Sequence, residues 1–122
     1  ENAAVAILRP RNTEEVSQAV KTCRLLGLGI IPQGGNTGLV QGGVPDGQSA
    51  VVILSLERMN RIRQVDPDDF SAIVDAGCIL LEMKTQLAAQ GMFFPLSLGA
   101  QGSCRIGGNV STNSGGVSFL RY

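Results

Sequence analysis

Three short apolar runs in the first half of the chain predict β-strands, at Ala4–Leu8, Gly29–Gln33 and Ala50–Leu56. Each run is followed by polar residues or by glycine, which marks its end. The third run is apolar almost throughout and contains several β-branched residues. We therefore expect it to form a strand that is covered on both faces.

A helix is predicted between the first two strands. The apolar residues that recur at helical spacing are Val16, Ala19, Val20, Cys23 and Leu26. Asn12 or Thr13 would cap the start of this helix, and Gly27 would end it. We expect Cys23 to serve core packing rather than reactivity, because it lies on the apolar stripe.

The middle of the chain predicts a β-hairpin and then a second helix. Residues 61–76 contain two short strand-like runs on either side of the turn sequence Pro-Asp-Asp. The helix is expected at Leu80–Gln90, ending at Gly91, and a short strand is expected at Met92–Pro95. The helix residues expected to face inward are Leu80, Met83, Leu87 and Ala88.

The clearest functional motif directly follows the second predicted strand. Residues Pro32–Gly43 read Pro-Gln-Gly-Gly-Asn-Thr-Gly-Leu-Val-Gln-Gly-Gly. Glycine brings backbone N–H groups to a surface without a Cβ, and a row of such amides binds anionic oxygens. Asn36 and Thr37 add side-chain donors, but the loop contains no lysine or arginine. The stretch is therefore either a phosphate loop built from amides or a flexible surface loop.

Two familiar phosphate motifs do not fit this loop. A Walker loop requires a Gly-Lys pair, and none occurs in the chain. The dinucleotide fingerprint requires G-x-G-x-x-G at the start of a helix, whereas Gly35 and Gly38 do not have that spacing. Residues 40–45 resemble loop rather than the first turn of a long helix. A Rossmann domain is therefore not expected.

A second glycine-rich stretch lies near the end of the chain. Residues 91–103 weakly echo residues 27–38, since each has a helix end, an apolar run, a proline and a glycine loop. We expect the two loops to emerge on the same side of the fold. Residues 102–116 carry hydroxyls, amides and paired glycines, which favours a ligand-lining surface over a glycine/serine linker. Ile106 and Val110 are four apart, so a short helix is expected there with its start facing the ligand.

Length, charge and hydropathy limit the class of protein. The 122 residues suffice for one domain with a hydrophobic core. Ten basic and ten acidic residues cancel, and no basic block occurs, which argues against nucleic acid or an anionic membrane as partner. No apolar run is long enough for a membrane span. No signal peptide is visible and the first residue is not methionine, so we expect part of a longer protein.

The chemistry-bearing residues are few. The spacing of Cys23, Cys78 and Cys104 matches no metal site, which predicts reduced thiols in a cytosol-like compartment. The chain has no histidine, and this removes the commonest general base and every Ser-His-Asp arrangement. No catalytic or metal-binding residue is predicted. Redox or acid–base chemistry would come from a cofactor or from residues outside this chain.

With both loops in view, the chain resembles the flavin-binding domain of the vanillyl-alcohol-oxidase superfamily, the FAD-linked oxidases of PCMH type. Within it, the chain is most similar to the D-2-hydroxyacid dehydrogenase branch, which includes D-2-hydroxyglutarate and D-lactate dehydrogenases. Pro32–Gly43 matches the pyrophosphate loop of that family, and Pro95–Gly116 matches its second flavin loop. The resemblance implies an α+β fold, with a small parallel-stranded α/β lobe at about 1–90 and the start of a larger antiparallel lobe at about 91–122.

The resemblance implies that FAD lies extended between the lobes, with its pyrophosphate on the first loop. The cofactor-binding residues implied in the first loop are Pro32, Gln33, Gly34, Gly35, Asn36, Thr37, Gly38, Leu39 and Gly42. Those implied in the second loop are Pro95, Leu98, Gly99, Ala100, Gly102, Ser103, Gly107, Gly108, Asn109, Thr112 and Gly116. An aspartate at Gly35 is expected to enter the phosphate space and abolish flavin binding.

Some family members attach the flavin covalently, through a histidine near the position of Asn36 or a cysteine near that of Cys104. Asparagine cannot form that bond, and the sequence around Cys104 resembles the non-covalent branch, so the resemblance implies non-covalent FAD.

The implied function is the FAD-binding portion of an oxidoreductase that oxidises a D-2-hydroxy acid by hydride transfer to FAD. The substrate would be of the 2-hydroxyglutarate, lactate or glycolate class, and its ligands would lie beyond Tyr122. Residues 1–122 alone are therefore expected to be inactive. A homodimer in the cytoplasm or mitochondrial matrix is expected, and the electron acceptor is left open. The alternatives are a flavin-fold binding or regulatory module without redox activity and an unrelated phosphate-binding enzyme.

Overall fold

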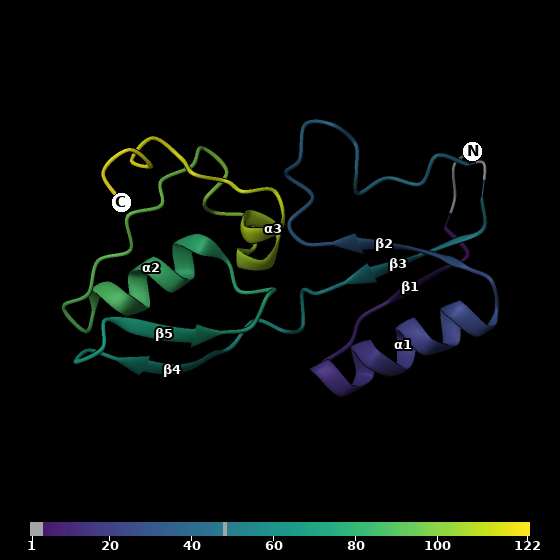
Figure 1. The fold of residues 1–122 in the computed structure, drawn as a ribbon, viewed down its shortest axis with the longest axis horizontal. Helices are drawn as coiled ribbons and strands as arrows, with labels where there is room; N and C mark the ends of the chain where they lie inside the picture. The colour runs from purple at the N-terminus through teal and green to yellow at the C-terminus, as the bar shows by residue number, and fades with distance from the viewer. Residues whose placement is uncertain (1–3, 48) are drawn as a thin grey trace.

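The computed structural model describes residues 4–47 and 49–122. Two groups of elements lie side by side along the long axis of the molecule (Figure 1). The elements in chain order are β1 (Ala6–Leu8), α1 (Thr13–Leu25), β2 (Gly29–Gln33), β3 (Val51–Ser55), β4 (Ile62–Asp66), β5 (Ser71–Val74), α2 (Leu80–Ala88) and α3 (Ile106–Ser111). The mixture of helices with parallel and antiparallel strands confirms the predicted α+β class.

The first group is a parallel sheet with the strand order β1-β3-β2. Parallel neighbours require crossover connections, and here α1 joins β1 to β2 while the first glycine loop begins the connection from β2 to β3. The central strand β3 is buried at Val51, Val52, Leu54 and Ser55, so both of its faces are covered as predicted. The strand β2 has the predicted bounds, and its last residue leads directly into the glycine loop.

The helix α1 begins and ends as the sequence predicts. The Oδ1 atom of Asn12 accepts a hydrogen bond of 2.8 Å from the backbone N–H of Glu15, and Gly27 follows the helix with a φ of +67°. Cys23 is buried, as expected for a core residue. Val20 and Leu26 are 43% and 66% exposed, so the apolar stripe is less buried than predicted. Leu26 is exposed because it is the C-cap, beyond the last helical residue.

The second group consists of the antiparallel β4–β5 hairpin, the helix α2 and the segments that pack around them (Figure 1). Its core is the cluster Cys78, Leu80, Met83, Leu87 and Cys104. The three helix residues in this cluster confirm the predicted inward face of α2. Ala88 is exposed, so its predicted inward position is wrong; it is the last residue of the helix.

The strand predicted at Met92–Pro95 is wrong. This segment is irregular, and the backbone N–H of Met92 bonds to the carbonyl of Leu87 at the end of α2. Met92 and Phe94 pack against the core cluster, which explains why the segment is apolar without pairing as a strand. The same cluster joins Leu87 to Cys104, on either side of residue 90. The lobe boundary near that residue stays a prediction.

Within the described part of the chain, no helix has the length and hydropathy needed to cross a membrane.

Candidate functional site

The two glycine loops are in direct contact. A Cβ placed on Gly35 would overlap the carbonyl oxygen of Ser103 and lie 3.0 Å from the Cα of Cys104. The neighbouring Gly34 faces the side chain of Arg105, whose Cβ and Cγ would be 3.3 Å from a Cβ at residue 34. The loops therefore emerge on the same side of the fold, as the echo between the two sequences predicts (Figure 1).

This contact changes the role of Gly35. We expected an aspartate at this position to enter the space of a bound phosphate, but a Cβ here would meet protein backbone first. The expected loss of flavin binding stays a prediction. The missing Cβ of Gly35 points at the backbone of Ser103 instead. Glycine is required here because two backbone segments approach too closely for any side chain.

The first loop presents backbone donors without protein acceptors. The N–H groups of residues 34–38 donate no hydrogen bond to any residue that the structure describes. Asn36 has a φ of +52°, a conformation that asparagine tolerates better than most residues. The Nε2 atom of Gln33 donates to the carbonyl of Gly43 over 3.3 Å, which closes the loop at its base. Such amides are available for an anionic ligand.

The rest of the first loop is open. Added Cβ atoms at Gly38 and Gly42 would meet nothing within 4 Å. Thr37 is exposed, and Leu39 is 98% exposed. Pro32 lies earlier, in β2, where it pairs with Leu54 in the sheet register. These residues form one rim of a surface that begins at the end of β2.

Two glycines of the second loop serve packing rather than an open surface. The N–H of Gly107 donates to the carbonyl of Ala76 over 2.8 Å, and a Cβ on this glycine would lie 2.8 Å from the Cβ of Ala76. Gly116 has a φ of +64° and faces the carbonyl of Ser97. These contacts explain both glycines within the protein, independently of any ligand.

Other residues of the second loop remain accessible. Ala100 and Ser103 are exposed, and Cβ atoms on Gly99, Gly102 and Gly108 would meet nothing within 4 Å. The remaining predicted residues, Pro95 and Leu98, are half-buried. Leu98 packs on the core cluster.

Two polar side chains of the predicted site, Asn109 and Thr112, lie in α3 and directly after it. The Oγ1 atom of Thr112 donates a hydrogen bond of 2.9 Å to the carbonyl of Gly108 and is also hydrogen-bonded to the Oγ atom of Ser114 over 2.8 Å. Asn109 is only 8% exposed, and its Oδ1 has no hydrogen-bond partner among the described residues. Burying an acceptor without a hydrogen-bond donor costs free energy. The Oδ1 atom of Asn109 is such an acceptor among the described residues.

Sequence reasoning missed Arg105. It is the only charged residue within Pro32–Gly43 and Pro95–Gly116, and that fact could have identified it. Its Nη1 atom donates a hydrogen bond of 2.6 Å to the carbonyl of Gly77. The side chain thus connects the second loop to the turn before α2 while its stem lies against Gly34.

Lys84 was also missed. Its Nζ atom donates to the carbonyl of Leu96 over 3.0 Å and to the Oε1 atom of Gln101 over 3.3 Å. These bonds tie α2 to the start of the second loop. No local pattern around Lys84 distinguishes it from an ordinary surface lysine of a helix.

The cysteines beside the site are buried and carry free thiols. Cys104 is 4% exposed and belongs to the core cluster, although both of its neighbours in the chain contact the first loop. Burial, together with the Glu82 carboxylate, raises the pKa of the Cys78 thiol against the opposing charge of Arg105. The Cys78 thiol is therefore not activated as a nucleophile.

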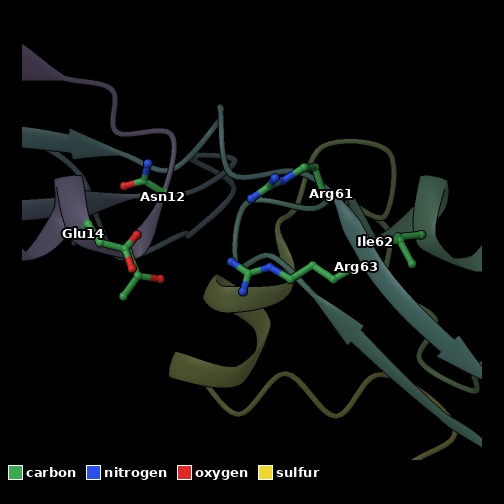
Figure 2. Close-up of a pocket in the computed structure, with 6 residues that line it drawn as sticks. Asn12, Glu14, Arg61, Ile62 and Arg63 are labelled. Carbon is green, nitrogen blue, oxygen red and sulfur yellow. The ribbon is translucent and has the colours of Figure 1, made fainter.

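A separate hollow of about 490 Å³ lies between the start of α1 and the β4–β5 hairpin. Figure 2 shows Arg61 and Arg63 reaching from the hairpin toward Asn12 and Glu14. Both guanidinium groups bond to the carboxylate of Asp75, at 3.1 and 2.5 Å. Because this carboxylate already balances part of the arginine charge, and none of the predicted cofactor residues lines the hollow, the glycine loops remain the candidate site.

Asp75 is a buried anion at the centre of this arrangement, with a side chain that is 0% exposed. Its burial alone would raise the pKa of the carboxyl group. Hydrogen bonds from the backbone and side chain of Arg61 and from the side chain of Arg63 outweigh that effect and lower the pKa below its usual range. The carboxylate therefore stays ionised and fixes the start of β4 against the end of β5.

Comparison with known proteins identifies the family. The sequence pattern of a family described as FAD binding domain matches residues 4–122. Over 116 residues, the chain is 48% identical to the mitochondrial D-2-hydroxyglutarate dehydrogenase of Arabidopsis thaliana and 46% identical to that of Rattus norvegicus. Each alignment covers 95% of this chain but only 20% and 21% of the relative. The chain therefore spans about a fifth of the length of these relatives.

The fold also matches a solved structure. An alkyldihydroxyacetonephosphate synthase superposes with a TM-score of 0.85 and 28% sequence identity. The match covers 95% of this chain and 23% of the synthase. Both groups of elements are therefore arranged as in this larger protein.

Proposed function

Because the chain belongs to the family of FAD-binding domains, we propose that its two glycine loops together hold the pyrophosphate of FAD. The observation that carries this proposal is the row of backbone N–H groups at residues 34–38, which have no acceptor among the described residues. These amides lie against the second loop through the contact of Gly35 with Ser103. A single diphosphate at this junction would accept hydrogen bonds from the first loop and touch the exposed part of the second.

The residues present fit this cofactor. The open spaces at Gly38, Gly99 and Gly102 leave room for a ligand to approach the backbone. The exposed Ala100 and Ser103 lie in the same stretch of the second loop. No group of three or more His, Cys, Asp or Glu side chains that could hold a metal occurs in the described part of the chain. The proposed site offers backbone amides to the phosphate groups.

We propose further that the FAD is bound non-covalently. Asn36 offers no nucleophile in the first loop. The thiol of Cys104 belongs to the hydrophobic core cluster and is 4% exposed, so it is turned away from solvent and from an entering ligand. A thioether would require this side chain to leave the core.

The activity proposed for the complete protein is oxidation of a D-2-hydroxy acid. This proposal is supported by relatives that are named D-2-hydroxyglutarate dehydrogenases. The flavin supplies a hydride acceptor when it is bound. Residues 1–122 bind and orient the cofactor, and no catalytic residue is assigned to them. The alternative, a binding module without redox activity, would keep the same loops.

The experiment that tests this function uses the purified complete protein. Its flavin should be identified as FAD and should lose its visible absorption on anaerobic addition of D-2-hydroxyglutarate, D-lactate or glycolate. The L-enantiomers of the first two acids serve as matched controls, because the proposed substrate is the D form. Bound FAD that none of these acids reduces would favour the binding module over the dehydrogenase.

The cellular location and the oligomeric state of the complete protein stay predictions. The relatives from Arabidopsis and rat are named as mitochondrial, which supports the mitochondrial matrix over the cytoplasm as the proposed location. A homodimer is retained as a proposal that size measurement of the complete protein would test.

A further inference from the structure

Arg105 is the one charged residue that the two glycine loops themselves contain. The first loop contains no charged residue, and Arg105 is the only one in the second loop. The fold places its Cβ and Cγ against Gly34, where the row of free amides begins. Separate regions of the sequence thus combine into one site with amides from one loop and a cation from the other.

No carboxylate in the described part of the chain neutralises this charge. The Nη1 atom of the guanidinium donates to the neutral carbonyl of Gly77, and the buried Nε has no partner among the described residues. None of the described carboxylates forms an ion pair with Arg105. Arg61 and Arg63 differ, because both are paired with the buried Asp75. A half-buried cation without a counter-ion favours the arrival of an anion beside it.

We propose that Arg105 is the positioned cation that balances the pyrophosphate of bound FAD. This inference rests on the proposed function and deepens it. The bond to Gly77 keeps the guanidinium in place, and the Cβ and Cγ atoms of the same side chain lie against Gly34 at the start of the first loop. The Nε atom of Arg105 is buried, so we expect the side chain to act on the phosphate through the electric field of its charge rather than through a hydrogen bond from Nε.

Two substitutions separate the charge from the shape of the side chain. Arg105→Met keeps an unbranched stem against Gly34 but removes the charge, and Arg105→Lys keeps both the stem and the charge. Arg24→Met, in the last turn of α1, removes one positive charge from a residue outside both loops and serves as the control. Melting of each apoprotein should be measured alongside binding, because a folding defect would otherwise imitate a binding defect.

The binding measurement is a titration of the complete apoprotein with FAD, followed by flavin fluorescence, at low and high salt. We expect Arg105→Met to weaken FAD binding by roughly tenfold to a hundredfold, on the order of one screened charge–charge interaction. Arg105→Lys should bind within about threefold of wild type, and Arg24→Met should equal it. Salt should weaken FAD binding to the wild type more than to Arg105→Met, because the variant lacks the charge that salt screens.

Two results would overturn the inference. Equal losses in Arg105→Met and Arg105→Lys would assign Arg105 to loop geometry alone, and unchanged binding in Arg105→Met would remove it from the site. A wild-type protein without affinity for FAD would contradict the proposed function itself, and this inference with it. The wild-type titration therefore distinguishes the two failures.

Discussion

Gly35 and Ser103 are separated by most of the chain, yet the space that a Cβ of Gly35 would fill is occupied by the carbonyl oxygen of Ser103. This contact joins the loop that follows the parallel sheet to the loop that precedes α3. It is a contact between two backbone segments. If a larger residue replaced Gly35, no rearrangement of side chains could relieve the resulting clash. The close approach of the two loops at this point therefore requires glycine at position 35.

The first prediction concerns this contact. Gly35→Ala should destabilise the apoprotein by about 1–3 kcal/mol, because a buried methyl group must displace the backbone of Ser103. FAD affinity should fall as well, since the loops can no longer keep their spacing. Thermal unfolding of the apoprotein and FAD titration measure the two effects. Gly38→Ala is the control for stability, because its Cβ meets nothing within 4 Å, and an equal destabilisation of both variants would contradict the account.

The second prediction concerns Gly77. A Cβ on this residue would overlap the carbonyl of Leu56 and lie 2.7 Å from that of Met59. Gly77→Ala should therefore destabilise the apoprotein by about 1–3 kcal/mol, and it should also disturb the carbonyl that holds Arg105. Urea unfolding at neutral pH measures the loss. Gly102→Ala, whose added methyl group has open space, should change stability by less than about 0.5 kcal/mol.

The third prediction is a pH dependence centred on Asp75. Its folded-state pKa lies below the ordinary value of 3.8, so its ionised form contributes stability above the unfolded pKa. That contribution is lost as the pH falls through the folded pKa. Asp75→Asn should cost about 1–3 kcal/mol at neutral pH, because it weakens charged hydrogen bonds to Arg61 and Arg63. The free energies of unfolding of the two proteins should converge below about pH 4, and a constant difference down to strongly acidic pH would contradict this role.

The fourth prediction concerns the bond between protein and flavin. If the FAD is bound non-covalently, as we propose from the burial of Cys104, acid precipitation of the complete protein should release the yellow colour into the supernatant. Cys104→Ala should leave FAD bound, although it should lower the melting temperature by removing a core side chain. Flavin that stays in the wild-type pellet but is released from Cys104→Ala would show that the thiol is attached to it.

The sequence predicts a helix or strand of this fold well where residues within that same segment determine its ends. Asn12 and Gly27 specify the ends of α1 through capping and a positive φ, and both act within a few residues. The bounds of β2 follow from an apolar run that ends at glycine. The segment at Met92–Pro95 is different, because its apolar residues pack on α2 and no partner strand in the described chain pairs with it. Hydrophobicity indicates burial there, but it does not indicate how the backbone bonds are made.

Only part of the candidate site can be predicted from the sequence, because some of its contacts join residues that are far apart in the chain. The two loops could be found from their glycines, and the echo between them indicates a common side of the fold. The sequence pattern does not indicate which atoms each glycine contacts. Gly35 and Gly107 serve contacts with Ser103 and Ala76, and those partners are distant in the sequence. The sequence shows Arg105 as the only charged residue of the two loops, but its proximity to Gly34 exists only after the chain has folded.

The central claim is that the two loops jointly hold the pyrophosphate of FAD. Its most direct test is an experimental structure of the complete protein with FAD bound. We predict pyrophosphate oxygens within about 3 Å of backbone nitrogens of residues 34–38, beside the contact of Gly35 with Ser103. FAD bound with its pyrophosphate away from these amides, or a second loop separated from the first, would contradict the claim.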